Sequence, residues 1–204
     1  MPRVFAMTEG IIDSQRLAEA AALLRRGGLV AFPTETVYGL GADATNAQAM
    51  ERLGRVKGRP QGKYYSLHVG SVEQFSQLVE EVPALARLLI ERWWPGPLTL
   101  VLPSPDGATV GYRVPDHPLA QAFLSACGVP VAAPSANRSG ASPPRNAAAV
   151  IEAFGDAIEG VIDGGPTRLG RESTVVEVRG SRLMIHREGA IARAAIDATT
   201  PHGH

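Results

Sequence analysis

The chain has 204 residues, 45% hydrophobic and 20% charged, a composition typical of globular proteins and unlike that of disordered or fibrous ones. Its 20 Lys and Arg balance 20 Asp and Glu, so net charge provides no general attraction to nucleic acid or membrane. Cys127 is the only cysteine, which excludes an intramolecular disulfide and a cysteine-based zinc site. No stretch is apolar enough for a signal peptide or a membrane span, and we expect a cytoplasmic protein that does not contact membranes.

Each predicted helix in the first half of the chain follows a residue that favours helix N-termini, and two of them end at a glycine. The strand between the first two helices stops at Pro33, because proline cannot donate to a strand ladder. In chain order, these elements are a helix from Asp13 or Ser14 to Gly27, a strand over 29–32, and helices that begin after Asn46, at the Ser71–Gln74 capping box and at Pro83.

The second half contains two pairs of strands that are joined by turn residues and therefore predicted to be antiparallel. In chain order, it is predicted to hold strands over 98–102 and 110–114, a helix over 118–128, a strand over 129–133, a helix over 146–154 and strands over 174–178 and 183–187. Helices that interleave with such strands predict an α/β (α+β) fold, a mixed sheet with flanking helices. We expect one domain over 1–195 and a flexible tail over 196–204.

Two glycine-rich stretches must be tested against common nucleotide-binding motifs. Residues 39–44 match G-x-G-x-x-A, but the next helix begins too late and no acidic residue lies about 20 positions further on. Residues 58–63 resemble a P-loop that is one residue short, and Tyr64 replaces its Ser or Thr. Both motifs therefore fail, and no G-x-S-x-G or H-E-x-x-H sequence indicates a hydrolase.

Polar side chains instead gather in loops that glycine or proline residues flank. Four cations lie in or beside these loops: Lys57, Arg59, Arg113 and Arg187. Together they suit a polyphosphate, because arginine binds phosphate oxygens in a bidentate manner. Simpler interpretations are open for each: Lys57 and Arg59 as a solvated helix end, Arg113 in a surface ion pair with Asp116, and 133–140 as an ordinary turn.

Six strings of the chain, taken in order, resemble the YrdC family of threonylcarbamoyl-AMP synthases. The resemblance runs from Gly27 to Ile191, and its strings are GGLVAFPTETVYGLGADATN, KGRP, WWPGPLTLVL, YRVPDHP, VAAPSANRSG and ESTVVEV. It implies a twisted mixed sheet with a large concave, positively lined cavity. It also implies condensation of L-threonine, bicarbonate and ATP, with Mg²⁺, into threonylcarbamoyl-AMP and pyrophosphate. That product serves the modification of the adenosine next to the tRNA anticodon, through downstream threonylcarbamoyl-transferase proteins.

The resemblance assigns roles to the matched positions, and no metal ligand is among them. Lys57 and Arg59 match a basic pair that holds phosphates and are the expected catalytic residues. The expected threonine and carbamate contacts are Thr34, Tyr38, His68, Arg113 and Ser173. The expected ATP contacts, besides the basic pair, are Ser135, Asn137, Pro143 and Arg187.

The chain departs from the family pattern in two places. Tyr64 and Tyr65 replace a usual Pro-Leu pair near His68, and Glu188 replaces a proline beside Arg187. Three alternatives therefore remain: an RNA-binding module without catalysis, a carbamoyl-adenylate enzyme of another pathway, and a homologue that binds nucleotide without turnover. Direct contact with tRNA is expected to be weak or absent, since net charge is zero and aromatic residues make up only 5%.

Overall fold

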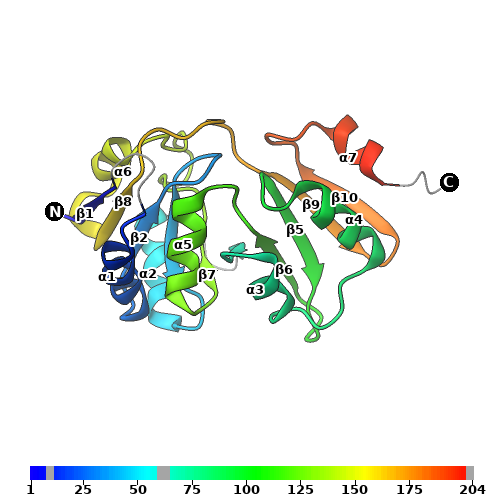
Figure 1. Ribbon diagram of the computed structural model, residues 1–204, viewed down its shortest axis with the longest axis horizontal. Coiled ribbons are helices and arrows are strands. Elements are labelled where there is room, and N and C mark those ends of the chain that lie inside the picture. Colours follow the sequence, from blue (N-terminus) through cyan, green and yellow to red (C-terminus); the bar gives the residue numbers. More distant parts are fainter. Residues whose placement is uncertain (8–11, 59–64, 201–204) are drawn as a thin grey trace.

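The computed structural model describes residues 1–7, 12–58 and 65–200, which form one long twisted sheet with helices on both faces (Figure 1). The strands follow the order β1-β8-β2-β3-β7-β4-β6-β5-β9-β10. Their bounds are β1 Arg3–Ala6, β2 Val30–Phe32, β3 Gly39–Asp43, β4 Leu67–His68, β5 Leu98–Pro103, β6 Thr109–Arg113, β7 Val131–Ala132, β8 Gly160–Asp163, β9 Thr174–Arg179 and β10 Arg182–Arg187.

The sheet is mixed, as the sequence predicts. Strand β8 pairs in parallel with β1 and β2, β4 pairs in parallel with β6, and β5 with β9. The predicted hairpins β5–β6 and β9–β10 are antiparallel. Strand β7 joins the two halves by pairing with β3 and β4, so the chain after β7 lies at the centre of the sheet.

Several helices begin or end where capping chemistry predicts. Asp13 and Asn46 accept hydrogen bonds from backbone N–H groups of the first turns of α1 and α2, and Gly58 ends α2 in the left-handed conformation at φ 60°. The helix bounds are α1 Ser14–Arg25, α2 Ala47–Lys57, α3 Val72–Ser76, α4 Ala84–Trp93, α5 Pro118–Cys127, α6 Ala147–Phe154 and α7 Arg193–Thr199, with a 3-10 turn, η1, over Gly155–Ala157.

The N-terminal half of the sheet is buried on both faces. Val30 and Phe32 of β2 pack with α1 and α5, whereas Ala31 between them packs with α2 and α6 on the opposite face (Figure 1). A strand that is covered on both faces has a continuous apolar sequence, in which polar and apolar residues do not alternate. None of the helices in the described part of the chain combines the length and the apolar composition that a membrane crossing needs.

The C-terminal half of the sheet is covered by helices on one face only. Leu98, Leu100 and Leu102 of β5 point into a core with Phe75 of α3 and Leu89 of α4. The residues between these leucines point to the opposite face, because side chains alternate along a strand. That opposite face forms the floor of a cavity.

The chain end differs from the prediction, because residues 196–199 lie in α7 and not in a flexible tail. Ile196 is fully buried in the core of the C-terminal half, and Trp93 donates a hydrogen bond to the Thr199 hydroxyl at 3.1 Å. Burial of an Ile side chain stabilises by about 1.5–3 kcal/mol, which fixes a short helix that lacks a strong sequence signal. The rest of the predicted tail, 201–204, lies outside the described residues.

Candidate functional site

A cavity of about 360 Å³ opens where the two halves of the sheet meet. This volume is at the lower end of the range of about 300–1000 Å³ for small-molecule sites. Seven of the predicted site residues line it together: Thr34, Tyr38, His68, Arg113, Ser135, Ser173 and Arg187. The structure therefore brings loops after β2 and β7 into one site with β4, β6, β9 and β10.

The floor of the cavity follows from side-chain alternation in β5 and β6. Thr99 and Val101 face the cavity, whereas Leu100 between them is buried in the core. In β6, Arg113 faces the cavity two residues after Gly111, where an added Cβ would lie 3.3 Å from the Ser66 Cβ. The glycine thus avoids a close contact with Ser66 at the cavity wall.

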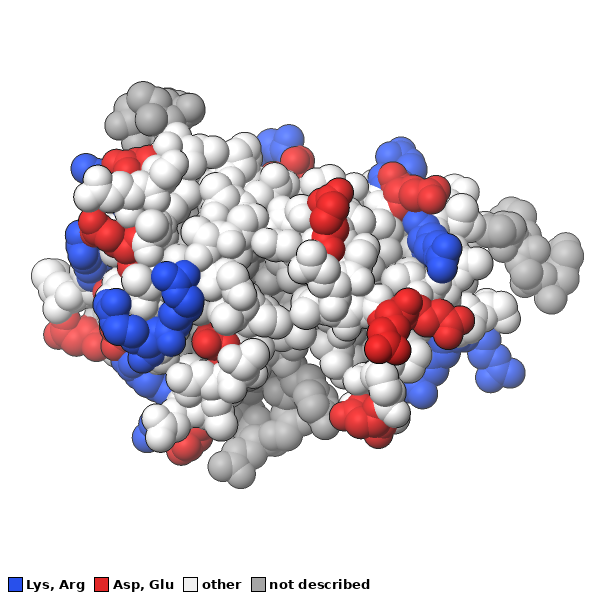
Figure 2. Space-filling view, turned by 60° about the horizontal axis from the view of Figure 1, so that its bottom comes forward, with Lys and Arg blue, Asp and Glu red and all other residues white. Residues whose placement is uncertain are grey.

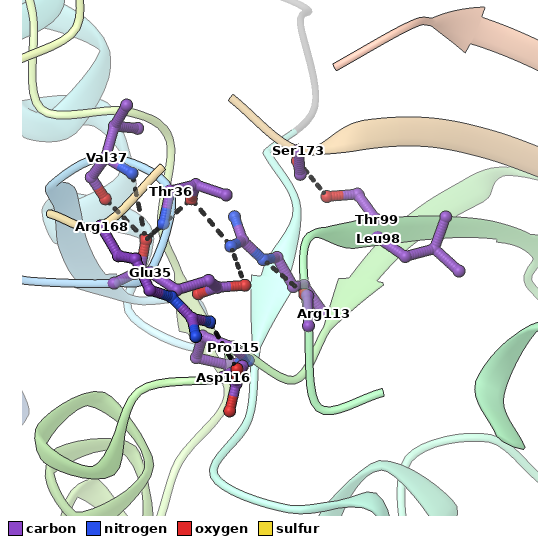
Figure 3. A network of polar contacts seen from close by, with 12 residues as sticks. Glu35, Thr36, Val37, Leu98, Thr99, Arg113, Pro115, Asp116, Arg168 and Ser173 are labelled. Atoms are coloured by element: carbon purple, nitrogen blue, oxygen red, sulfur yellow. Dashed lines mark hydrogen bonds and ion pairs between the residues drawn. The ribbon is translucent and has the colours of Figure 1, made fainter. Parts of the chain in front are cut away.

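Arg113 is a buried cation whose position is fixed on one side (Figure 3). It is only 4% exposed, and its Nη2 donates to Glu35 Oε1 and to the Thr36 hydroxyl, both at 2.8 Å. Its Nε donates to the Gly96 carbonyl at 3.3 Å. The alternative surface pair with Asp116 is wrong, because Asp116 instead pairs with Arg168 at 2.7 Å. Removing one partner of such a buried pair typically costs about 3–5 kcal/mol.

His68 lies beside Arg113 on the neighbouring parallel strand, where the two residues are paired in register. Burial, together with the positive charge of Arg113, lowers the pKa of His68 to about 3. The imidazole is therefore neutral at physiological pH and offers a hydrogen bond but no charge to an anionic ligand. Its Nδ1 is buried and has no hydrogen-bond partner among the described residues.

Thr34 and Tyr38 line the cavity, but both hydroxyl protons are already used within the protein. The Thr34 hydroxyl donates to the Val37 carbonyl at 2.7 Å. The Tyr38 hydroxyl donates to the Gly165 carbonyl at 2.8 Å, and burial raises the pKa of Tyr38 above its usual value. The two side chains therefore shape the wall, while other groups are available to donate hydrogen bonds to a ligand.

Ser173 and Arg187 meet on the far side of the floor. The Thr99 and Ser173 hydroxyls are 2.8 Å apart, and Arg187 Nη2 donates to the Ser173 hydroxyl at 3.3 Å. Arg187 also pairs with Glu172 at 3.0 Å, so its nearest carboxylate partner is not the neighbouring Glu188. Ser173 is buried whereas Arg187 is exposed, which places the arginine at the mouth of the cavity.

Lys57 is placed behind the loop over 133–140 and is not among the residues that line the cavity. It is 4% exposed, and its Nζ donates to the carbonyl oxygens of Ser135 and, at 2.6 Å, of Asn137. The Ser139 N–H in turn donates to the Lys57 carbonyl at 2.8 Å. The end of α2 and this loop are therefore one hydrogen-bonded unit.

The remaining predicted ATP contacts are less central. Asn137 is also outside the cavity lining, and its Nδ2 donates to the Ala141 carbonyl at 2.7 Å within its own loop. Pro143 does not line the cavity either, although Pro144 beside it accepts a hydrogen bond from the Tyr38 N–H at 3.0 Å. Arg59, like Tyr64, lies outside the described residues.

Several polar residues in or beside the cavity had no predicted role, among them Glu35, Thr36, Thr99 and Glu172. Thr99 carries a signal that alternation could have revealed, since it is the polar residue between two leucines that must face the core. Glu35 and Thr36 sit in an unpaired loop, where spacing says nothing about which side chain turns inward. Their role becomes visible only when Arg113 is placed beside them.

Charge is distributed in separate groups on the face shown in Figure 2. Lys and Arg side chains form a group at one end that Asp and Glu border, while at the other end the two signs alternate, and white residues separate most of the described charges between them. Taken without the grey residues, the described side chains on this face form no continuous basic band of the kind that binds a nucleic-acid backbone. Among the described residues, no group of three or more His, Cys, Asp or Glu side chains could hold a metal ion.

Comparison with known proteins gives consistent results. The family model Sua5_yciO_yrdC, described as telomere recombination, matches residues 22–189. The chain is 44% identical to the threonylcarbamoyl-AMP synthase of Bacillus subtilis over 91% of its own length and 57% of that protein. It is 39% identical to the synthase of Halorhodospira halophila, over 82% of this chain and 91% of that one.

A solved structure has the same fold. Pyrococcus abyssi Sua5 complexed with L-threonine superposes with a TM-score of 0.89 at 39% identity, over 98% of this chain and 60% of that one. The chain thus spans a little over half the length of the Bacillus and Pyrococcus proteins that it matches.

Proposed function

Since the chain belongs to the Sua5/YciO/YrdC family, we propose that it is a threonylcarbamoyl-AMP synthase. The substrates would be L-threonine, bicarbonate and ATP, and the products threonylcarbamoyl-AMP and pyrophosphate. The observation that carries the proposal is an anchored, buried Arg113 at the closed part of a cavity whose mouth bears Ser135 and Arg187. Such a site suits an anionic amino acid derivative inside and a nucleotide outside.

The inner part of the cavity would bind threonine and its carbamate. Arg113, His68 and Ser173 are each 4% exposed there. A guanidinium group can hold a carboxylate, while a neutral imidazole and a hydroxyl can supply hydrogen bonds to the rest of the ligand. Binding of L-threonine by the similar Pyrococcus protein supports this assignment.

The outer part would bind ATP. Ser135 lies on the half-buried loop after β7, and the exposed Arg187 is held at the mouth through Glu172 and Ser173. Lys57 would act on the same loop through its hydrogen bonds to Ser135 and Asn137, with Arg59 as the proposed phosphate contact beyond the end of α2.

The reaction needs no covalent bond to the protein. The threonine amine adds to the carbon of bicarbonate, and water leaves, which gives a carbamate. A carbamate oxygen then attacks the α-phosphorus of ATP, and the bond to the bridging oxygen breaks so that pyrophosphate leaves. Holding the two reactants in line contributes about 7–11 kcal/mol, and cations near the leaving group stabilise the charge that develops there.

Magnesium would enter as a complex with ATP and not through a dedicated protein site. The described residues offer no cluster of carboxylates, and Glu172 at the mouth is paired with Arg187. A Mg²⁺ ion typically keeps several waters and binds the phosphate oxygens of the substrate. When bound, it would neutralise charge on the triphosphate.

The product is a reactive mixed anhydride, so a cytoplasmic threonylcarbamoyl-transferase would have to consume it to modify tRNA. The proposal is tested by incubating the protein with ATP, L-threonine and bicarbonate and measuring pyrophosphate. We expect release that requires all three substrates. Steep salt-dependent RNA binding without pyrophosphate release would favour the RNA-binding alternative, and release with another carbamoyl acceptor would favour an enzyme of another pathway.

A further inference from the structure

The Arg113 guanidinium uses only part of its hydrogen-bonding capacity within the protein. Of its five N–H donors, the one on Nε and the two on Nη2 bind Gly96, Glu35 and Thr36. The two on Nη1 make no hydrogen bond with any described residue, and Arg113 lines the cavity. One edge of the guanidinium is therefore anchored, and the other edge is available to a ligand.

The Thr36 hydroxyl, which accepts a hydrogen bond from Arg113, is itself held in one orientation. The Thr34 hydroxyl has one proton, which it donates to the Val37 carbonyl. The Thr36 hydroxyl, 2.8 Å from that of Thr34, must then donate to Thr34 and can only accept from Arg113. A chain of hydroxyl groups thus prevents Thr36 from turning its proton toward the arginine.

Glu35 provides the only negative charge in direct contact with Arg113 among the described residues. It is 1% exposed and does not line the cavity, so it cannot contact a ligand directly. Its backbone carbonyl accepts a hydrogen bond from the Leu169 N–H at 2.8 Å, which ties its loop to the segment before β9. Its effect on a ligand must pass through Arg113.

We propose that Glu35 is a positioning residue, which holds the Arg113 guanidinium so that Nη1 faces the carboxylate of the bound amino acid. This inference rests on the proposed synthase activity, because that activity supplies the amino acid. The carboxylate of Glu35 restricts Arg113 to one orientation before the ligand arrives. A ligand that binds a preorganised cation loses less free energy in ordering it.

The test compares Glu35→Gln with Asp116→Asn, a matched control in the nearby exposed ion pair with Arg168 (Figure 3). Titration calorimetry with L-threonine and with ATP separately gives the two affinities. We expect Glu35→Gln to weaken threonine binding on the order of tenfold, the effect of one misplaced charge-assisted hydrogen bond. ATP affinity should change less than about twofold, and Asp116→Asn should match the wild type in both.

A mutant cycle separates positioning from a general structural effect. If Glu35 acts through Arg113, adding Glu35→Gln to Arg113→Gln should change threonine affinity by less than about twofold. Should Glu35→Gln fail to fold, Glu35→Asp keeps the charge and shortens its reach, and should weaken threonine binding while leaving ATP binding unchanged.

The outcomes also separate this inference from the proposed function. A wild-type protein that neither binds threonine nor releases pyrophosphate would refute the synthase proposal itself. An active wild type with equal threonine affinity in Glu35→Gln and Asp116→Asn would refute only the role of Glu35. Equal losses of threonine and ATP affinity would also contradict positioning, because they indicate general damage to the site.

Discussion

Lys57 Nζ donates a hydrogen bond to the backbone carbonyl of Asn137 at 2.6 Å, which fastens the last residue of α2 to the loop after β7. The same ammonium group contacts the Ser135 carbonyl. Lys57, which the family resemblance assigns to phosphate binding, thus also holds the backbone of the neighbouring loop in place. The arrangement makes the end of α2 and the loop that we propose to bind ATP mutually dependent.

Replacing Lys57 with methionine should reduce both stability and activity. Two carbonyl groups would lose their donor, and each unsatisfied buried group costs about 1–3 kcal/mol. We expect the free energy of unfolding to fall by about 1–3 kcal/mol, the cost of leaving at least one of the two carbonyl groups unsatisfied. Pyrophosphate release should fall at least about tenfold. Urea unfolding and a pyrophosphate assay measure the two effects. Arg55→Met, whose side chain is 70% exposed in the same helix turn, is the control and should change neither. Wild-type values for Lys57→Met would refute the assignment.

Ser135→Ala should affect ATP more than threonine. Ser135 is half-buried on the cavity wall, so loss of its hydroxyl removes one hydrogen bond to a nucleotide without exposing the core. A neutral hydrogen bond contributes about 0.5–1.5 kcal/mol, which corresponds to a rise of about two- to tenfold in the apparent KM for ATP. Steady-state kinetics with each substrate varied in turn measures this. An unchanged KM for ATP, or a larger effect on threonine, would contradict the assignment.

Thr99→Val should weaken threonine binding through Ser173. The Thr99 and Ser173 hydroxyls form a hydrogen bond at 2.8 Å on the cavity floor, and valine keeps the shape while removing the oxygen. We expect threonine affinity to fall about two- to tenfold. The double variant with Ser173→Ala should be no weaker than Ser173→Ala alone, since both changes remove the same interaction. Additive losses in calorimetric titration would show that the two hydroxyls act separately.

Protein stability should depend on pH through His68. Its pKa is about 3 in the folded protein and close to 6.5 in the unfolded chain, so the unfolded state binds the proton first as pH falls. The stabilising contribution of neutral His68 is complete above pH 6.5 and is lost progressively down to pH 3. Each pH unit within that window costs up to about 1.4 kcal/mol.

Comparison of the wild type with His68→Gln isolates this effect from the other titrating groups. Between pH 7 and pH 5, the free energy of unfolding should fall more steeply in the wild type. Urea unfolding at several pH values provides the measurement. Parallel pH profiles would show that His68 takes up a proton at the same pH in the folded and unfolded states, so that it could carry charge toward a ligand below about pH 6.5.

Much of the fold could be predicted because its signals are local. The caps at Asp13 and Asn46 and the antiparallel hairpins follow from neighbouring residues, and the structure confirms them. Strand β3 was missed because Gly39 and Gly41 favour turns, and only pairing with β2 and β7 makes the segment extended. Strand β1 and helix α7 likewise depend on distant partners, Glu159 and Trp93.

The site was predictable to a similar degree and for a similar reason. The family resemblance named seven residues that the structure brings into one cavity, including Arg113 of β6 and Ser173 just before β9. It did not indicate that Glu35 anchors Arg113 or that the Lys57 ammonium lies behind the loop. Such contacts are set by the orientation of side chains in three dimensions, and one sequence holds no record of it.

The central claim is that one cavity joins three substrates into a single adenylate. The most direct measurement incubates the protein with [¹⁴C]bicarbonate, [α-³²P]ATP and L-threonine and separates the products rapidly. We predict one product that carries both labels, forms only when threonine is present, and appears in equal amount to unlabelled pyrophosphate. Labelled AMP or ADP without any ¹⁴C-containing adenylate would contradict the account.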